Sequence, residues 1–300
     1  MTIFSISKNK RISETDKCDS AVKAGDILVR LTAVLFWTMV WWGCSVAVGK
    51  EILLPSPWLV LRRLCELAGT REFWLSCGGS LLRVIAGFAL AFVCGIAMGV
   101  LMRLSPLLRR LLEPLLAVVK ATPVASFIIL ALVWIKSTMT PVFIAFLIVL
   151  PVITSNVDEG IAQTDARLIE MCDIFGIRGI KRLRALYIPS LAPYLLAAVR
   201  TGLGLAWKSG VAAEVIGRTR GSIGDMLYQS KLYLETADLF AWTAAVVVLS
   251  RGLELAVVAA GQRFQRQKIS PAFFKGRRGS WGAAPTKSLA AASETPQPNQ

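Results

Sequence analysis

Long apolar runs without charged residues alternate with short charged segments along the first half of the chain. Residues 31–49 lie between Arg30 and Lys50 and contain no charge. As a helix, this run would be about 28 Å long, close to the thickness of the hydrocarbon core of a bilayer. Uncharged runs at 84–102 and 137–157 repeat the pattern. The pattern predicts membrane-spanning helices.

Three further segments are apolar but carry isolated charges. Residues 112–135 include Pro123, which removes a backbone donor, so a helix there should bend or break. The segments 188–212 and 239–261 each contain two charged residues, which favours burial in a helix bundle over contact with lipid. We predict an all-α polytopic membrane protein with about six transmembrane helices. The predicted spans are 31–49, 82–102, 112–135, 138–157, 188–212 and 239–261.

The segments between the spans predict how the chain is oriented. With the N-terminus inside, the inner segments carry 21 Lys and Arg residues and the outer ones 9. Because positively charged loops stay in the cytoplasm, both termini are expected there. A transmembrane domain at 31–265, with a cytoplasmic loop at 158–187, then lies between tails at 1–30 and 266–300. The C-terminal tail lacks apolar periodicity and is expected to be largely disordered.

The outer segment 50–79 is long enough to hold a short helix of its own. Pro55 and Pro57 precede an apolar stretch that begins at Trp58, and proline is favoured in the first turn of a helix. We expect this helix to lie on the membrane surface.

Composition supports the membrane interpretation and excludes several classes of protein. The chain is 55% hydrophobic with a mean hydropathy of +0.58, too apolar for an ordinary water-soluble protein. Its net charge of +15 would suit nucleic acid, but the Lys and Arg residues gather between the apolar runs, so no nucleic-acid partner is expected. The absence of histidine excludes His-containing catalytic triads and His-ligated zinc. No catalytic residue, metal site or cofactor is predicted. The six cysteines have no CxxC spacing and are interpreted as free thiols: Cys18, Cys44, Cys65, Cys77, Cys94 and Cys172.

The predicted cytoplasmic loop contains a short amphipathic segment. Leu168, Ile169, Cys172 and Phe175 are spaced by three and four residues, which predicts a helix with one apolar face. Gly176 can end this helix in a left-handed conformation. Such a helix would suit docking to another protein, and it would equally suit an interface with lipid headgroups, which the basic residues after it favour.

The spacing within this loop resembles a known motif. Glu170, Gly176 six residues later and Pro189 nineteen residues after the glutamate resemble the EAA loop of binding-protein-dependent ABC importer permeases. In that family the loop is the coupling helix that seats in a groove of the ATPase subunit. Met171 and Cys172 replace the two alanines of the consensus. The resemblance implies ATPase-coupling roles for Leu168, Glu170, Met171, Cys172, Asp173, Phe175, Gly176, Ile177 and Pro189.

Further stretches extend the resemblance from about residue 30 to residue 265, and they are similar to the nitrate, sulfonate and taurine branch of these importers. The resemblance implies the type I ABC importer permease fold, a multi-pass position in the bacterial inner membrane, and a small anion such as an aliphatic sulfonate, taurine or nitrate as substrate. The implied partners are two cytoplasmic ATPase subunits, an extracytoplasmic substrate-binding protein, a second copy of the chain and membrane lipid. The matching stretches are Leu54-Pro55-Ser56-Pro57, Ser80-Leu81-Leu82-Arg83-Val84 with Gly87, Ala121-Thr122-Pro123, Gly204-Leu205-Ala206-Trp207, Ala212-Ala213-Glu214-Val215-Ile216-Gly217 and Gly221-Ser222-Ile223-Gly224.

The chain is expected not to be an enzyme. It has no GxxxxGK[ST] phosphate loop, so ATP hydrolysis is expected on the partner ATPase. One alternative is a secondary transporter driven by an ion gradient, which would need buried carboxylates, and Glu254 is the one candidate within a predicted span. A membrane-embedded enzyme is a second alternative, but no cluster of nucleophiles, acids or metal ligands at one depth supports it.

Charged residues and glycines within the spans leave other questions open. Gly95 and Gly99 have GxxxG spacing, which suits close helix packing within the subunit or a contact between two copies. Arg200 lies deep in the fifth span, where it could attract an anion, although we favour a structural ion pair with Glu254 as a possible partner. Two more candidates for the substrate pathway lie further along the chain. Lys208 is interpreted first as an interfacial anchor, and Glu214 first as part of a solvated outer loop.

Overall fold

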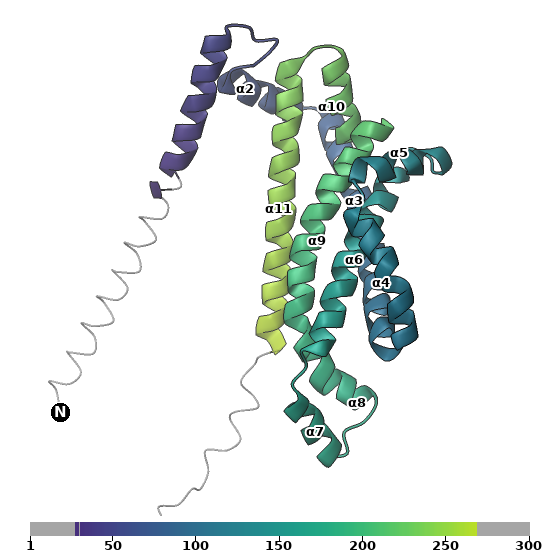
Figure 1. Ribbon diagram of the computed structural model, residues 1–300. Coiled ribbons are helices and arrows are strands. Elements are labelled where there is room, and N and C mark those ends of the chain that lie inside the picture. Colours follow the sequence, from purple (N-terminus) through teal and green to yellow (C-terminus); the bar gives the residue numbers. More distant parts are fainter. Residues whose placement is uncertain (1–27, 30, 269–300) are drawn as a thin grey trace, which may run out of the picture. The chain divides into compact units, whose positions relative to one another are not determined.

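The described elements are all helices, as predicted. The structure is a computed structural model that describes residues 28–29 and 31–268, with side chains up to residue 259. Most of the predicted tails, and Cys18 with them, lie outside these residues. The chain divides into two units, 1–258 and 259–300. The helices (Figure 1) are Leu31–Val48, α2 Pro57–Ala68, α3 Arg71–Leu104, α4 Pro106–Ala121, α5 Val124–Trp134, α6 Thr140–Ala162, α7 Ala166–Ile174, α8 Ile180–Arg182, a π-helical stretch Leu183–Tyr187, α9 Ile188–Gly217, α10 Ile223–Leu232 and α11 Thr236–Lys268.

Five of these helical stretches are long and apolar enough to cross a membrane, and a bent pair, α4 with α5, raises the number to six. The predicted fold class, with about six transmembrane helices, is therefore confirmed. The five stretches are Leu31–Val48, Arg71–Leu104, Thr140–Ala162, Ile180–Gly217 and Thr236–Ala259.

The segment predicted as a bent span at 112–135 is broken more sharply than a proline kink requires. It consists of α4, which begins at Pro106, and α5, and the two helices meet at 105°. Thr122 and Pro123 both have extended backbone angles, as expected for a proline and the residue before it. This part of the chain is a broken span or a re-entrant loop.

Local sequence explains where several helices begin. Ser56 caps α2 by accepting a hydrogen bond from the Leu59 amide, and Pro57 occupies the first turn. Ser105 and Pro106 repeat the arrangement at α4. The short helix expected in segment 50–79 is therefore present as α2.

Small residues allow α3 and α6 to approach closely. Gly87, Ala91, Gly95 and Gly99 recur every four residues on one buried face of α3. A Cβ atom on Gly95 would lie 2.7 Å from the Cβ of Ile153, and one on Gly99 would lie 2.7 Å from the Cβ of Val157, both on α6. The GxxxG pair therefore packs within the subunit, and a contact between two copies at these glycines is excluded because α6 occupies that face.

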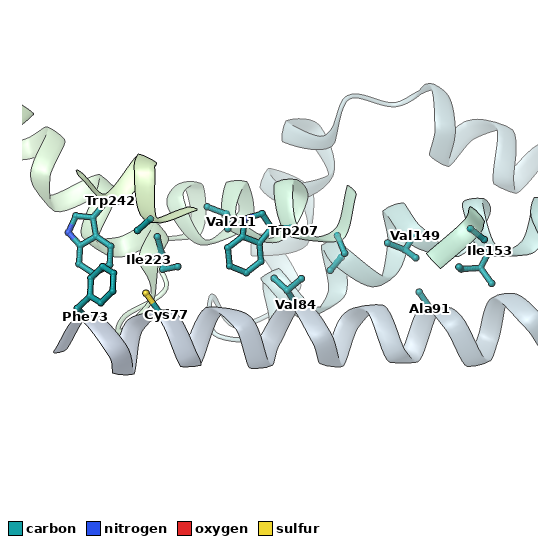
Figure 2. Packing of buried hydrophobic residues seen from close by; sticks show 14 of the residues in the cluster. Phe73, Cys77, Val84, Ala91, Val149, Ile153, Trp207, Val211, Ile223 and Trp242 are labelled. Atoms are coloured by element: carbon teal, nitrogen blue, oxygen red, sulfur yellow. The ribbon is translucent and has the colours of Figure 1, made fainter. Parts of the chain in front are cut away.

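The core continues from this seam toward the N-terminal end of α3 (Figure 2). Val84 on α3 and Trp207 on α9 are almost fully buried, and the Trp207 indole N–H donates to the carbonyl of Val246 on α11 at 3.1 Å. Further along, Phe73 stacks on Trp242 with ring centroids 5.0 Å apart. These contacts hold α3, α9 and α11 together around one apolar core.

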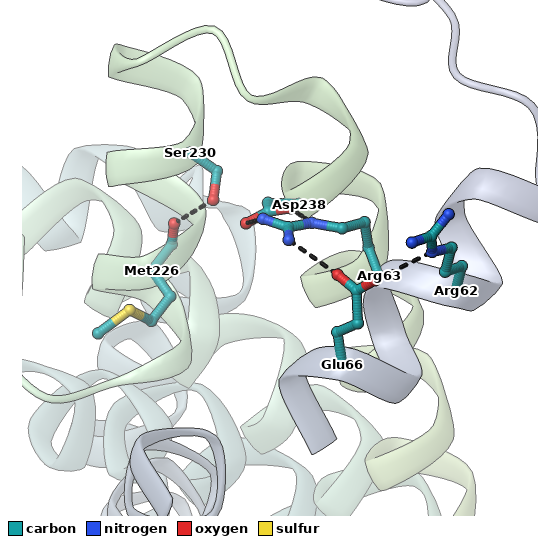
Figure 3. A network of polar contacts seen from close by, with 6 residues as sticks. All are labelled: Arg62, Arg63, Glu66, Met226, Ser230 and Asp238. Atoms are coloured by element: carbon teal, nitrogen blue, oxygen red, sulfur yellow. Dashed lines mark hydrogen bonds and ion pairs between the residues drawn. The ribbon is translucent and has the colours of Figure 1, made fainter. Parts of the chain in front are cut away.

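An ion network fastens α2 to the start of α11 (Figure 3). Arg63 forms two hydrogen bonds with Asp238, at 2.6 and 2.9 Å, and a third with Glu66 at 2.9 Å. The neighbouring Arg63 and Arg62 guanidinium groups hold the pKa of the Glu66 carboxyl below its ordinary value of 4.5. Bidentate pairing of this kind fixes the orientation of α2 better than a single charge contact would.

Candidate functional site

The loop that the sequence singled out folds as a short helix with defined ends. Asp165 caps α7 by accepting a hydrogen bond from the Arg167 amide at 2.9 Å. At the other end Gly176 has φ +64°, and the Ile177 amide donates to the carbonyl of Cys172 at 2.8 Å. The helix is thus closed by a left-handed glycine, as predicted.

The predicted apolar face of α7 is divided between the buried and the exposed sides of the helix. Cys172 is buried, and Ile169 and Ile177 are half-buried. Leu168 and Phe175, which were expected on the same face, are 41% and 72% exposed. The prediction was wrong because spacings of three and four residues fit two overlapping faces of so short a helix.

The exposed side of α7 forms an apolar surface, which we call the α7 face: Leu168, Met171, Ile174 and Phe175. Leu168, Met171 and Phe175 are three and four residues apart and therefore lie on one side of the helix. Ile174 is 82% exposed and did not stand out in the sequence, although it lies three residues after Met171. In the described part of the chain nothing covers this face.

The two residues that replace the alanines of the consensus differ in exposure. Cys172, with 4% exposure, fills the buried position where a small residue fits. Met171 is 46% exposed and enlarges the α7 face with a flexible, polarizable side chain.

Connections on both sides tie α7 to the long helices. Asp173 forms an ion pair with Arg182 at 2.8 Å, which folds the loop after α7 back onto it. From α8 the chain continues through the π-helical stretch into α9 as one helical stretch of 38 residues. Before α7 in the chain, Gly160 near the end of α6 packs against the ring of Tyr194 on α9. A Cβ added to Gly160 would lie 3.0 Å from that ring. A displacement of α7 would therefore act on both α6 and α9.

Glu170 and Pro189, the remaining residues assigned to coupling, are both exposed. Pro189 lies near the start of α9, directly after the π-helical stretch Leu183–Tyr187.

The candidate pathway cations lie on α9. Arg200 and Lys208 are both exposed. The interpretation of Arg200 as the ion-pair partner of Glu254 was wrong: Glu254 pairs with Arg251, three residues before it, at 2.6 Å. Arg200 forms no ion pair with any residue that the structure describes.

Glu214 is not in a solvated loop, contrary to the first interpretation, because α9 continues to Gly217 and turns this residue toward α3. The carboxylate is fully buried and accepts hydrogen bonds from Ser80 at 2.6 Å, from Arg83 at 3.1 Å and from the Gly224 amide at 3.4 Å. Ser80 in turn accepts from the Ile223 amide at 3.0 Å. This buried cluster fastens the turn between α9 and α10 onto α3, so Glu214 has a structural environment and no open side.

Within the described residues there is also no group of three or more Cys, Asp or Glu side chains placed to hold a metal ion.

Comparisons with known proteins agree with this architecture. The profile of the family described as "Binding-protein-dependent transport system inner membrane component" matches residues 91–270. The chain is 29% identical over 240 residues to the taurine transport system permease protein TauC of Escherichia coli, covering 77% of this chain and 85% of the relative. It is 27% identical over 248 residues to the bicarbonate transport system permease protein CmpB of Synechocystis sp., covering 77% of this chain and 88% of the relative.

A solved structure shares the fold. The chain resembles a chain of the MetNI methionine ABC transporter, solved in inward-facing conformations, with a TM-score of 0.53 and 18% identity, covering 71% of this chain and 97% of the other. The ABC importer permease fold expected from the sequence is thereby confirmed.

Proposed function

The chain belongs to the family of binding-protein-dependent transport system inner membrane components, and on this premise we propose that it couples to its ATPase through the α7 face. As a permease subunit of an ABC importer it is a multi-pass inner-membrane protein. ATP hydrolysis then takes place on the separate ATPase subunits, two of which serve two copies of this chain.

One observation carries the proposal. Leu168, Met171 and Phe175 expose an apolar surface on a helix that is fixed at both ends, by the Asp165 cap and by the left-handed Gly176. Exposed apolar side chains on a rigid helix suit insertion into a groove of another protein. Because α7 is joined to α6 and α9, force received there passes into two candidate membrane spans.

Co-purification with the ATPase tests this docking role. Phe175→Asp places a charge on the α7 face and should abolish retention of the ATPase by the purified chain. Ala166→Asp is a matched control, because Ala166 is an exposed residue on the opposite side of the same helix. If Phe175→Asp retains the ATPase as well as Ala166→Asp does, the docking role is refuted.

The assembly that we propose sets the orientation. The end of the bundle that carries α7 faces the cytoplasm together with both termini, and α2 faces the extracytoplasmic substrate-binding protein. Labelling of single cysteines by an impermeant maleimide in intact cells tests this: Phe175→Cys should react only after the membrane is opened.

We further propose a small anion as the substrate. Relatives of the chain include a taurine and a bicarbonate permease, and α9 exposes two cations, Arg200 and Lys208, about 12 Å apart along the helix. Uptake of labelled taurine and bicarbonate by the assembled transporter in proteoliposomes tests this. Uptake should need ATP, and Arg200→Gln should reduce it. The alternative of an ion-gradient transporter has no comparable support, since Glu254 is exposed and paired with Arg251.

A further inference from the structure

Arg109, near the start of α4, lies between two carboxylates. Its Nη2 donates to Oδ2 of Asp158 on α6, and its Nε donates to Oε1 of Glu113 at 2.9 Å, one turn along its own helix. The guanidinium group thus donates one hydrogen bond to each of two carboxylates, whereas in a bidentate pair both bonds would go to the same carboxylate. Arg109 therefore keeps one carboxylate partner even if Asp158 moves away.

Asp158 is only partly satisfied by this contact. Its side chain is 16% exposed, and its Oδ1 is buried and accepts no hydrogen bond from any described residue. Burial removes most of the water around this carboxylate, which costs free energy that would be recovered if the helices parted. The ion pair favours contact between α4 and α6, and the hydration of Asp158 favours separation.

The rest of the α4–α6 contact is slight. Leu116 and Val119 are the buried side chains of α4, whereas Leu107, Leu111, Leu115 and Val118 are exposed. A second polar contact, from Lys120 Nζ to Ser155 Oγ at 2.8 Å, joins a charge to a neutral hydroxyl. The ion pair is accordingly the strongest polar contact between these two helices.

The position of the pair links it to α7. Asp158 lies in the last turns of α6, which ends at Ala162, and α7 begins at Ala166. On the other side of the pair, α4 leads through the 105° break into α5 (Figure 1). A displacement of α7 would reach Asp158 before it reaches most of α6.

We propose that the Arg109–Asp158 pair is a releasable latch between α4 and α6, which opens and closes as α7 moves, so that Asp158 is a positioning residue for transport. Its link to the transport cycle rests on the proposed docking of the ATPase at α7. Glu113 acts as the alternative partner that holds Arg109 when the latch is open.

Spin-label distances test the latch, because the two carboxylates should act in opposite directions. Nitroxides are placed at Leu111→Cys on α4 and Ala162→Cys on α6, in the full chain with its six native cysteines replaced by alanine. The short distance between the nitroxides represents the closed latch and the long distance the open one. Asp158→Asn should shift the ratio of the two populations about ten-fold toward the long distance, the effect expected for losing one charged hydrogen bond. Glu113→Gln should shift the ratio toward the short distance.

Glu159→Gln is the matched control, since Glu159 is an exposed neighbour of Asp158 that bonds only to Gln163 among the described residues. If the pair only stabilised the fold, Asp158→Asn and Glu113→Gln would not shift the distance ratio in opposite directions. The latch is refuted if Asp158→Asn and Glu113→Gln shift the ratio in the same direction, or if Glu159→Gln shifts it as much as Asp158→Asn.

A second measurement tests the link to transport. In the complex with the ATPase, a non-hydrolysable ATP analogue should change the ratio several-fold in the chain with Asp158 intact and much less in Asp158→Asn. Suppose that Phe175→Asp releases the ATPase, but that the analogue leaves the distance ratio unchanged in the complex of the chain with Asp158 intact. The latch then has no part in transport, and the docking role stands. If Phe175→Asp does not release the ATPase, the docking role fails whatever the ratio does.

Discussion

The buried carboxylate of Glu214 should be a major determinant of stability. It is fully buried, and its three donors are the Ser80 hydroxyl, the Arg83 guanidinium and the Gly224 amide. Glu214→Gln keeps the shape but removes the negative charge beside Arg83. Whichever way the amide turns, its NH2 faces a donor, either the Arg83 guanidinium or the Ser80 hydroxyl and the Gly224 amide.

The expected size of the effect follows from the exposure of the two partners. Breaking a buried ion pair by removing one partner costs roughly 3–5 kcal/mol. The Arg83 side chain is 22% exposed and can recover some hydration, so the lower end of this range, about 3 kcal/mol, applies. For a domain of this size the loss corresponds to a fall of roughly 6–12 °C in the Tm.

Thermal unfolding of the detergent-purified chain measures this fall. Glu235→Gln, at an exposed carboxylate between α10 and α11, is the control and should shift the Tm by no more than about 2 °C. In a double-mutant cycle with Arg83→Gln, the two substitutions should be non-additive by about 1–3 kcal/mol. Additive effects, or a Tm for Glu214→Gln equal to that of Glu235→Gln, would refute the assignment of this cluster.

Three further predictions concern packing, backbone strain and pH. Gly99→Ala should destabilise the chain by about 1–3 kcal/mol because its Cβ would meet Val157, whereas Gly204→Ala, with nothing within 4 Å, should be neutral or slightly stabilising; equal melting temperatures would contradict this. Gly176→Ala should weaken ATPase retention through a left-handed strain of about 1–2 kcal/mol, and Gly176→Asn should restore much of it, since Asn tolerates that conformation; equal retention by all three chains would contradict this. Arg63 and Arg62 lower the pKa of Glu66, so the charge of Glu66 stabilises the fold above pH 4.5 and loses that effect as the pH falls through the lowered pKa. The Tm difference between the unaltered chain and Glu66→Gln should therefore shrink between about pH 6 and pH 3. A Tm difference that grows over this range would contradict the prediction.

Features that depend on neighbouring residues in the sequence were predictable. The run 31–49 corresponds to the helix Leu31–Val48 because charges flank it on both sides. The break at Pro123 and the left-handed Gly176 follow from the backbone properties of proline and glycine. In each case the cause lies within a few residues of its effect.

Features that depend on distant residues were not predictable in the same way. Glu214 is buried because Ser80 and Arg83 meet it from more than a hundred positions earlier in the chain. Glu254 is the opposite case: its partner Arg251 lies three residues before it on the same helix, and this local spacing favoured Arg251 over the distant Arg200. Which side of α7 faces inward is likewise decided by how the flanking helices hold it, not by its own spacing.

Photo-cross-linking from α7 tests most directly the claim that this helix is where the permease meets its ATPase. A photoreactive amino acid is placed at position 175, on the α7 face, or at position 166 on the other side of the helix, and the membranes containing the assembled transporter are irradiated. Position 175 should give an adduct with the ATPase, and position 166 should not. An adduct with lipid alone from position 175 would contradict the account and would make α7 an interfacial helix.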